Sequence, residues 1–451
     1  MMKQKRLNIK WLLLFSMMLI HTIGVKGETE VLDTIPLPLR SYLIGKELDS
    51  IQNESVLLPF WTGLDSLIAG KDTVLTIVHL GDSHVQAGHY TGKMMRLFQA
   101  QFGNAGRGWI APFKLGRTNE PDDYFITSTV REWISGRCVQ AKKKCPIGLG
   151  GIGIQSISPS INLNVHIAPK NGAGYSFNQA VIYRGDKAMP MLPTGPYKDS
   201  IQTILGTDSL ISGILIDTFR TVSQIDTLLL HSTRRKQGTD ELLPASSFKN
   251  LYYGFSLTNG SSGILYHSIG VNGAMYVHYT DSNYVRQLAL LKPSLLIVSL
   301  GTNETFGRRF NSQEFAGQVQ AFVCLIKQYM PNTVILLTTP PECYKRTYVN
   351  KKRTYVRNSN TELAAKAILK VAQEENLSCW DLFAVTGGKN SCTKWRQEKL
   401  MGRDRVHFTK EGYHEQAILF YRALMTTFNQ HLKSVKLFDD TEKLAEEKRD
   451  E

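Results

Sequence analysis

Continuous apolar runs alternate with helix-like periodic stretches in two separate parts of the chain. In the first part, residues 75–80 form an apolar, β-branched run, and residues 86–102 follow with apolar side chains at helical intervals. The second part begins near Gly263 and repeats this order, with strands predicted at 264–269, 295–300, 333–338 and 377–383 and helices at about 281–291, 313–329, 360–375 and 411–432. Strands that alternate with helices predict parallel βαβ units, and therefore an α/β fold with a three-layer α/β/α sandwich around a parallel sheet.

The helical period disappears between residues 113 and 259. Short β-rich runs occupy this stretch, separated by Gly, Pro, Asn and Asp, at 161–167, 179–183, 211–216, 227–230 and 251–257. They predict an all-β sandwich or jelly-roll-like domain, inserted after the first βα unit of the α/β domain. A single extended sheet that decorates the α/β core is the alternative. The α/β domain would then comprise residues 71–112 and 260–435.

The first 27 residues have the pattern of an export signal. A basic stretch reaches Lys10, an apolar run follows to Ile20, and small residues near Gly27 offer a cleavage point. An uncleaved membrane anchor is the alternative, but Ser16 and His21 interrupt the run, which is short for a bilayer. We therefore expect residues 1–27 to be removed, with no stable membrane insertion afterwards, and the mature protein to be periplasmic or secreted.

Composition limits the class of protein. Of the 451 residues, 42% are hydrophobic and 20% charged, proportions that exclude a disordered or fibrous chain. The formal net charge of +14 falls to +9 without the five cations of the first 27 residues, which favours acidic partners only slightly. Residues 28–70 form an N-terminal segment without recognisable chemistry, and residues 436–451 form a charged tail that we expect to fray.

Six cysteines in an exported chain permit disulfides. Cys138 with Cys145 and Cys379 with Cys392 are two local pairs that could form. Cys324 lies in an apolar helix-like stretch, where a buried free thiol is expected. None of the spacings matches a zinc site, and we expect no metal.

The glycine-rich run 148–153 fits a dinucleotide-binding pattern by its letters alone. It lacks the strand before and the helix after that such a site requires, so a glycine-rich loop or a bent strand is the better interpretation. The P-loop, H-E-x-x-H and G-x-S-x-G patterns are absent from the sequence. Nucleotide hydrolysis, zincin proteolysis and the common α/β-hydrolase arrangement therefore lose support, and no organic cofactor is expected.

Candidate catalytic residues lie at two turns more than 300 residues apart. Ser83 stands where the first apolar strand passes into a helix, which would expose its hydroxyl at the carboxyl edge of the sheet near backbone N–H groups. Asp404 and His407 share one polar loop, where the carboxylate could hold Nδ1–H while Nε2 accepts the serine proton. Each pattern has an ordinary alternative: Ser83 could simply cap the helix, and Asp404 could pair with Arg403 or Arg405.

Two further strand ends offer donors for an oxyanion. The apolar strand 295–300 is followed by residues 301–304, in which the Asn303 amide could donate a hydrogen bond without adding charge. The strand 264–269 runs into residues 270–274, where a glycine would let a backbone N–H approach a substrate closely. Because open α/β sheets bind ligands at the carboxyl ends of their strands, these positions are consistent with one shared site.

Four short blocks, in this order along the chain, resemble those of the SGNH, or GDSL-type, hydrolase superfamily: residues 81–83, 270–273, 301–303 and 404–407. Longer strings resemble the bacterial peptidoglycan O-acetylesterase branch of that superfamily: residues 81–84, 102–108 and 301–304. Members of that branch carry a carbohydrate-binding-like β domain inserted where this chain becomes β-rich. The resemblance covers about 71–112 and 260–435.

The resemblance implies a role for each matching polar residue. Ser83 would be the nucleophile, His407 the general base and Asp404 the residue that orients it. The oxyanion hole would combine the Ser83 N–H, a glycine N–H and the Asn303 amide.

The identity of the glycine donor is open at this point. The resemblance implies Gly273, because the family's donor is the glycine that closes the turn at residues 270–273. Gly270 is the alternative. Glu304 stands where the superfamily usually has Asp. We expect that change to affect positioning more than chemistry.

These implications predict an exported serine esterase that removes O-acetyl groups from a polysaccharide, either peptidoglycan or another bacterial or dietary glycan. A polysaccharide O-acetyltransferase with the same triad and a non-catalytic glycan-binding protein are the alternatives. The expected partner is an acetylated glycan and no nucleic acid, and the oligomeric state is left open. Trp133, Tyr175 or Tyr183 could stack on sugar rings or pack in the core. The basic residues between Arg346 and Arg357 could attract an acidic glycan or form a solvated loop.

Overall fold

The computed structural model describes residues 50–168, 174–207, 213–233 and 249–450. The expected export signal, residues 1–27, and the segment from 28 to 49 lie outside the described residues. Among the described residues, no helix combines the length and the apolar character needed to span a bilayer.

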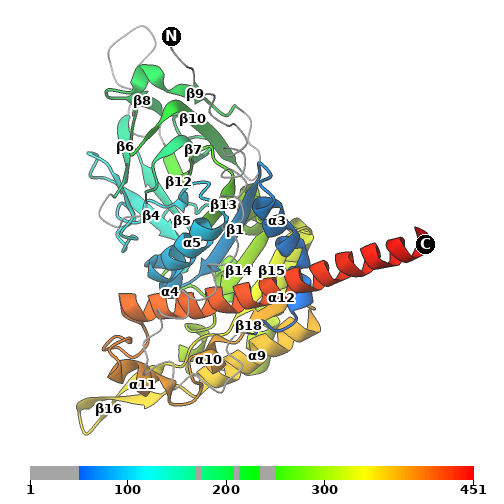
Figure 1. Cartoon of the computed structure of the whole chain (residues 1–451). Coiled ribbons are helices and arrows are strands. Elements are labelled where there is room, and N and C mark those ends of the chain that lie inside the picture. Colours follow the sequence, from blue (N-terminus) through cyan, green and yellow to red (C-terminus); the bar gives the residue numbers. More distant parts are fainter. Residues whose placement is uncertain (1–49, 169–173, 208–212, 234–248, 451) are drawn as a thin grey trace, which may run out of the picture. The chain divides into compact units, whose positions relative to one another are not determined.

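Five parallel strands form the central sheet (Figure 1). In spatial order they are β13 (Gly263–Gly270), β1 (Val74–Gly81), β14 (Leu295–Ser299), β15 (Val334–Thr338) and β18 (Ser378–Trp380). Every neighbouring pair is parallel. Nearly all residues of β1, β14 and β15 are buried, as expected for strands covered on both faces. The predicted parallel sheet is confirmed.

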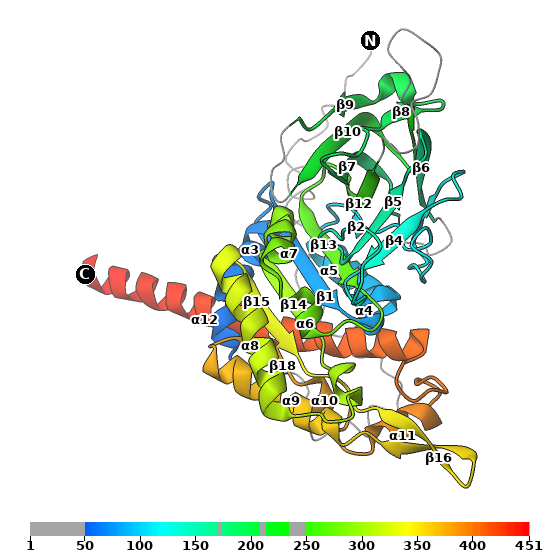
Figure 2. The same cartoon turned by 180° about the vertical axis from the view of Figure 1, so that it is seen from behind.

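Helices cover both faces of this sheet, as the front and back views show (Figure 2). One face carries α3 (Leu58–Ile68), α5 (His89–Phe102) and α12 (Lys410–Asp450), and the other carries α7 (Ser282–Leu288), α8 (Ser312–Tyr329) and α9 (Asn360–Glu374). Trp380 at the end of β18 stacks on Phe420 of α12 with ring centroids 4.4 Å apart. Phe98 of α5 meets Tyr421 of α12 edge-on at 5.0 Å. The predicted three-layer α/β/α sandwich is confirmed.

Shorter elements connect these layers. They are η1 (Glu54–Leu57), α4 (Ser83–Gln86), α6 (Tyr276–Tyr279), η5 (Ala289–Leu291), η6 (Glu304–Phe306), α10 (Leu382–Val385) and α11 (Ser391–Gln397). The strand predicted at 377–383 ends at Trp380, because the Asp381 carboxylate accepts the N–H of Ala384 and starts α10. A hairpin that the sequence analysis missed follows β15, formed by β16 (Tyr344–Val349) and β17 (Lys352–Arg357).

The β-rich part of the chain forms two antiparallel sheets, which rules out the single extended sheet. The larger has the order β4 (Ile134–Arg137), β5 (Ile152–Ser156), β12 (Asn250–Thr258), β7 (Phe177–Gly185), β10 (Ile214–Ile225) and β9 (Gln202–Ile204), with β2 (Gly108–Ile110) also pairing β12. The smaller has the order β3 (Tyr124–Thr127), β6 (Ser160–Ile167), β11 (Thr227–Thr233) and β8 (Leu192–Thr194), while a short 3-10 helix, η3 (Lys198–Ser200), precedes β9. Alternate residues of β6 are buried, as in a strand with one face on a core. The glycine-rich run 148–153 turns into β5 with no helix after it, as expected.

Three aromatic residues proposed as sugar platforms lie in the interior instead. Trp133, Tyr175 and Tyr183 are exposed by only 5%, 1% and 5%. Trp133 packs against Tyr252, and Tyr183 against Trp109. Their role is core packing, and the sugar-stacking interpretation is wrong for all three.

The cysteine predictions also need correction, because all six cysteines are free thiols. The Cys145 thiol donates to the carbonyl of Gly153 at 3.4 Å instead of meeting Cys138. Cys392 lies against the sulfur of Met401, whereas its proposed partner is within β18. Cys324 is exposed, since it lies on the outer side of α8.

We expected the charged tail to fray, but the structure shows it as part of a helix. The backbone of α12 continues without interruption from Lys410 to Asp450.

Candidate active site

Three neighbouring strands, the edge strand β13 with β1 and β14, bring their carboxyl ends together. Gly81 at the end of β1 pairs with Gly270 of β13 on one side and Ser299 of β14 on the other. The loops that follow therefore start side by side. They carry the expected site residues Ser83, Gly273 and Asn303.

Ser83 is the first residue of α4. Asp82 caps this short helix, since its Oδ1 accepts the N–H of His84 at 2.9 Å. The Ser83 side chain stays half-buried, and its Oγ lies 2.9 Å from Nε2 of His407. Two residues that are 324 positions apart in the sequence thus come into hydrogen-bond contact.

A tight loop orients the imidazole of His407. Asp404 Oδ1 accepts the backbone N–H groups of Val406 and His407, both at 3.0 Å. Asp404 Oδ2 lies 2.7 Å from Nδ1 of His407. Gly402 closes the loop by donating its N–H to the His407 carbonyl at 2.7 Å. A proton on Nδ1 is held by the carboxylate, which leaves Nε2 as an acceptor for the Ser83 hydroxyl.

Electrostatics favour opposite charges on the two loop residues. Partial burial acts to raise the pKa of Asp404, but hydrogen bonds from His407 and the backbone outweigh it and lower the pKa to about 2. The hydrogen bond with Asp404 raises the pKa of His407 above its usual value, against the effect of burial. Asp404 is therefore a carboxylate throughout the range in which His407 titrates.

The raised pKa of His407 predicts the position of the acid limb of the pH profile. Only neutral imidazole can accept the Ser83 proton, so kcat/KM should fall as the pH drops through a pKa above 6.5. Replacing Asp404 with Asn removes the largest cause of the shift and should move this limb to lower pH, with a much slower reaction. Initial rates on a small acetyl ester, measured across the pH range, test both statements. An acid limb at the same pH in the Asp404→Asn variant would contradict the assigned pairing.

A buried carboxylate, Asp82, holds the side chain of Asn303. The Asn303 amide nitrogen donates to Asp82 Oδ2 and to the carbonyl of Ala274, both at 3.0 Å. Burial raises the pKa of Asp82 to about 7, although the N–H of His84 and the charge on His407 oppose the shift. To serve an oxyanion, Asn303 must share or release one of these two bonds. No local sequence pattern marks this role of Asp82, because its partner lies 221 positions away.

Glu304 links the turns that follow β13 and β14. Its side chain is buried, and Oε1 accepts the N–H of Tyr276 at 2.9 Å. Burial raises the pKa of Glu304 to about 7, opposed by the hydrogen bond from Tyr276. Glu304, which stands where Asp is usual, therefore makes a contact that positions the turn after β13 against the turn after β14.

The two candidate glycine donors have different surroundings. A Cβ on Gly270 would lie 2.3 Å from the backbone nitrogen of Gln86, so this glycine allows β13 and α4 to pack closely. Gly273 has a φ of +82° and open space where a Cβ would be. Among the described residues, the N–H groups of Gly273 and Ser83 have no hydrogen-bond acceptor. This geometry favours Gly273 over Gly270 as a donor.

The loop that leads into the β-rich part braces the Gly273 turn. Gln86 of α4 donates to the hydroxyl of Thr118 at 2.9 Å and to the carbonyl of Asn119 at 2.7 Å. Asn119 Oδ1 accepts the side-chain amide of Asn272 at 2.6 Å, and Gln86 Oε1 accepts the backbone N–H of Asn272 at 2.7 Å. The β-rich segment thus contributes to the site itself, which the sequence did not predict.

Removing the Asn119 side chain should loosen the turn that contains Gly273. We expect Asn119→Ala to lower kcat/KM on a small acetyl ester by about five- to tenfold, the equivalent of roughly one lost hydrogen bond. Asn119→Asp is the matched control, since its carboxylate still accepts from Asn272 and Gln86. Unchanged turnover of Asn119→Ala on the small ester would limit this loop to a role in binding polymer.

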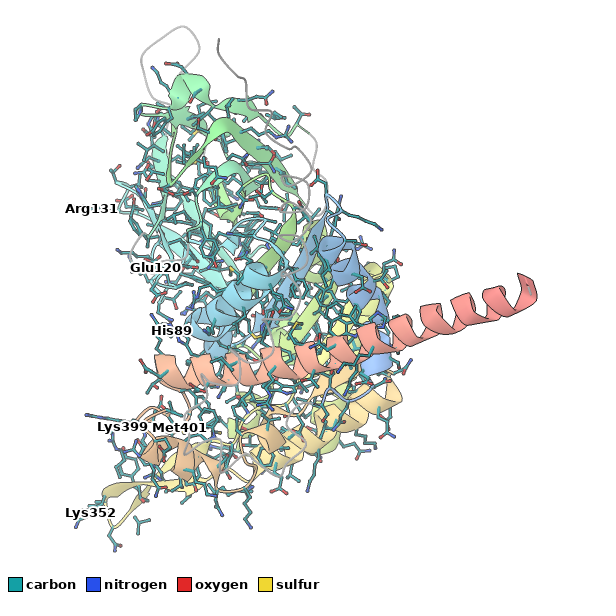
Figure 3. The ribbon with its side chains drawn as sticks, viewed as in Figure 1. His89, Glu120, Arg131, Lys352, Lys399 and Met401 are labelled. Atoms are coloured by element: carbon teal, nitrogen blue, oxygen red, sulfur yellow. The ribbon has the colours of Figure 1, made fainter. Side chains whose placement is uncertain are left out.

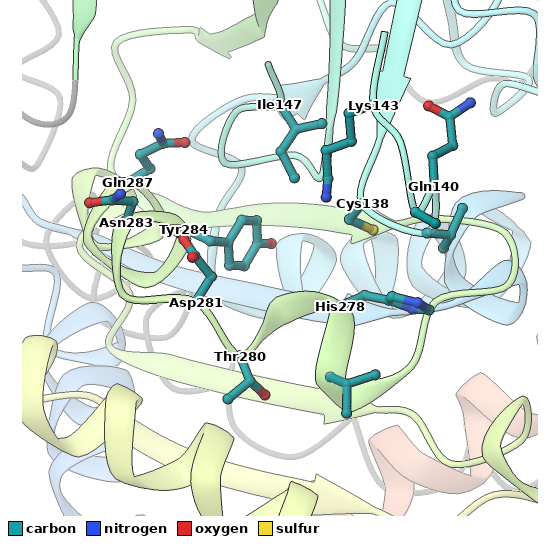
Figure 4. A pocket seen from close by; sticks show the side chains of 13 residues that line it. Cys138, Gln140, Lys143, Ile147, His278, Thr280, Asp281, Asn283, Tyr284 and Gln287 are labelled. Carbon is teal, nitrogen blue, oxygen red and sulfur yellow. Dashed lines mark hydrogen bonds between the residues drawn. The ribbon is translucent and has the colours of Figure 1, made fainter. Parts of the chain in front are cut away.

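A separate pocket of about 570 Å³ lies beside α6 and α7 (Figure 4). Its lining includes Cys138, Lys143, His278 and Tyr284. Since Ser83, Asp404 and His407 are not among the lining residues, the triad does not open into this pocket. Among the described residues, no group of three or more His, Cys, Asp or Glu side chains could hold a metal ion.

Comparison with known proteins agrees with this architecture. Residues 244–415 match the model of the GDSL-like lipase/acylhydrolase family. This part of the chain is therefore similar to GDSL-like acylhydrolases. The family match includes Asp404, His407, Asn303 and Gly273, whereas Ser83 lies before the matched residues.

The comparison with solved structures supports the fold through one match, and two further matches are much weaker. One described as a peptidoglycan O-acetylesterase in action is 19% identical, with a TM-score of 0.67, over 82% of this chain and 96% of that chain. A putative GDSL-like lipase from Parabacteroides merdae is 18% identical over 36% of this chain and 73% of that chain, with a TM-score of 0.29. A putative acylhydrolase from Bacteroides fragilis is 18% identical over 36% of this chain and 76% of that chain, with a TM-score of 0.29. The search of curated proteins found no match.

Proposed function

We propose that this protein is an exported serine esterase that removes O-acetyl groups from a polysaccharide. The observation that carries the proposal is the continuous chain of hydrogen bonds from Ser83 through His407 to Asp404 at the carboxyl edge of the sheet. A serine, an imidazole and a carboxylate in this order form the nucleophile, base and orienting group of acyl-transfer enzymes. An acylhydrolase domain supplies the reaction class.

The first half of the reaction transfers the acetyl group to the protein. Ser83 Oγ attacks the acetyl carbonyl while Nε2 of His407 takes the hydroxyl proton. The N–H groups of Ser83 and Gly273 and the amide of Asn303 would stabilise the tetrahedral oxyanion. When the carbon–oxygen bond to the sugar breaks, His407 returns the proton to the sugar oxygen, and the deacetylated glycan leaves.

The second half regenerates the serine. Water attacks the acetyl-enzyme, and Nε2 of His407 takes a proton from it. The second tetrahedral intermediate collapses, acetate leaves, and the proton returns to Ser83 Oγ. Asp404, held as a carboxylate, stabilises the imidazolium in both halves.

Two observations support a polymer as the substrate. Ser83 and His407 are half-exposed, so the reacting groups are accessible to a long chain that passes over the surface. Antiparallel sheets adjoin the acylhydrolase domain through the loop that braces Asn272. The similarity in fold to a peptidoglycan O-acetylesterase supports an O-acetylated polysaccharide as the proposed substrate class.

Acetate release tests the proposed function. O-acetylated peptidoglycan, acetylated xylan and acetylated pectin are incubated with the purified protein, and acetate is measured by an enzyme-coupled assay. Release from at least one polymer that is lost in the Ser83→Ala variant supports the proposal. Acetyl transfer to an acceptor glycan without acetate release would identify an O-acetyltransferase, and binding without either reaction would identify a glycan-binding protein.

A further inference from the structure

The hairpin β16–β17 alternates tyrosine and arginine on one face. In the strand register, Tyr344 lies opposite Arg357, Arg346 opposite Tyr355, and Tyr348 opposite Arg353. Residues directly opposite each other in an antiparallel pair point to the same side of the sheet, as do residues two apart in one strand. The six side chains therefore form one checkerboard of three aromatic rings and three guanidinium groups, which we call the Tyr–Arg face.

The base of the hairpin is fixed to the acylhydrolase domain. Buried Glu342 accepts the Arg357 side chain at 2.6 Å and the backbone N–H groups of Asn390 and Cys392 at 2.9 and 3.0 Å. Arg357 also donates to Glu362 at 2.8 Å. The charge of Arg357 is thus neutralised within the protein, and its role is to hold the hairpin in place.

The outer part of the Tyr–Arg face remains open. Arg346 and Arg353 are exposed and form no ion pair with another described residue, and Tyr348 is 63% exposed. No acidic residue occurs between 344 and 357. Lys352, which Figure 3 labels at the outer end of the hairpin, adds positive charge beside the turn on the other face.

Both faces of the hairpin contact loops of the candidate active site. On the Tyr–Arg face, the Arg405 guanidinium lies 4.7 Å from the ring centroid of Tyr355 and 5.5 Å from that of Tyr344. Arg405 follows Asp404 directly, and its carbonyl accepts the N–H of Tyr344 at 2.9 Å. On the opposite face, the Lys345 ammonium lies 5.8 Å from the ring of Phe306, three residues after Asn303. The Tyr–Arg face therefore leads directly to the catalytic loop.

We propose that the Tyr–Arg face binds a carboxylate-bearing glycan strand and guides it toward Ser83. The exposed ring of Tyr348 suits the apolar face of a sugar, and arginine binds carboxylates through paired N–H donors. The spacing of alternate residues along a strand repeats about every 7 Å, which provides successive positions along an extended polymer. This proposal rests on the proposed function and narrows its substrate class to anionic glycans.

The residue types in the hairpin turn agree with a functional role for this end of the hairpin. Asn350 and Lys351 both have positive φ, at 49° and 60°, in the two-residue turn. Such turns prefer glycine at the second position, where a side chain is strained. The chain has a lysine there instead, so the turn retains a positive charge at the expense of local backbone stability.

Binding to non-acetylated polymers tests the proposal without requiring catalysis. Polygalacturonate and soluble peptidoglycan strands serve as anionic probes, neutral xylan as the uncharged probe, and affinity electrophoresis gives the dissociation constant. We expect the anionic probes to bind more tightly than xylan and more weakly as salt increases. The double variant Arg346→Gln/Arg353→Gln should weaken anionic binding by at least about tenfold, and Tyr348→Ala should weaken it by a smaller factor.

Matched controls separate this site from general charge effects. Lys71→Gln/Lys292→Gln removes two positive charges from exposed positions that precede β1 and β14, away from the carboxyl edge of the sheet, and should leave binding unchanged. Both double variants should keep wild-type turnover of a small acetyl ester. Equal affinity of wild type and the arginine variant, equal binding of xylan, or tighter binding of a single-stranded oligonucleotide would overturn the proposal. Failure of esterase activity alone would reject the proposed function and leave the binding result intact.

Discussion

The Ser83→Ala variant is expected to lose about 10⁴- to 10⁶-fold in turnover of a small acetyl ester, because removal of a triad nucleophile disables the other members of the triad as well. Oγ of Ser83 is 2.9 Å from Nε2 of His407 and is the atom that would form the acetyl-enzyme. The remaining rate would come from the oxyanion donors and from substrate binding. Acetate release or chromophore release from an aryl acetate measures the loss.

The fold of this variant should be intact. The Ser83 hydroxyl is half-buried, and its loss removes one hydrogen bond to an exposed loop. Ser312→Ala is a matched control, since Ser312 is also the first residue of a helix but lies at an exposed position of α8. Near wild-type turnover of folded Ser83→Ala would show that another group is the nucleophile.

The second large effect is expected at Asn303. The Asn303→Ala variant should lower kcat by roughly a hundred- to a thousandfold with little change in KM, since an oxyanion donor acts mainly on the tetrahedral state. Asn303→Asp should be at least as harmful, because a carboxylate accepts instead of donating and would lie beside the Asp82 carboxylate. Steady-state kinetics on a small ester separates kcat from KM.

A stability control is needed for Asn303, because its amide also bonds Asp82 and Ala274. Asn311→Ala removes an asparagine that likewise makes two hydrogen bonds, at the N-cap of α8. It should lower the melting temperature by a similar amount without loss of kcat. Nearly normal kcat in folded Asn303→Asp would exclude Asn303 from the oxyanion hole.

The α/β fold could be predicted because its strands are buried on both faces. Such strands appear in the sequence as uninterrupted apolar runs, and four of the five central strands match the predicted ranges closely. The hairpin β16–β17 escaped prediction for the opposite reason. Its strands are exposed and alternate tyrosine with arginine, so they contain no apolar period.

The candidate site could be predicted only in part. Local turns carry Ser83 and the Asp404–His407 pair, and the sequence shows each turn directly. The bond between Asp82 and Asn303 and the contact of Asn119 with Asn272 join segments more than 150 residues apart. No local pattern reports such contacts, because tertiary packing alone creates them.

The sequence also did not predict which individual aromatic and sulfur-containing residues are buried. Trp133 is buried between two exposed neighbours just before β4, whereas Tyr183 lies in a part of β7 where four consecutive residues are buried, so no simple alternation marks either position. Cys379 and Cys392 are near in sequence, yet one lies inside a parallel strand and the other on α11. Short spacing along the chain therefore did not predict pairing.

The position of β1 between β13 and β14 has a consequence for how the protein is made. Strand β1 is synthesised before every other strand of this sheet, but both of its neighbours emerge only after the whole β-rich part of the chain. Such long-range pairing makes folding slow. Until its partners form, β1 has unpaired edges that are prone to aggregation. His407 follows Ser83 by 324 residues, so the candidate active site cannot assemble until almost the entire polypeptide has been synthesised. A nascent or truncated chain would therefore be inactive, and esterase activity would report completed folding of the whole molecule.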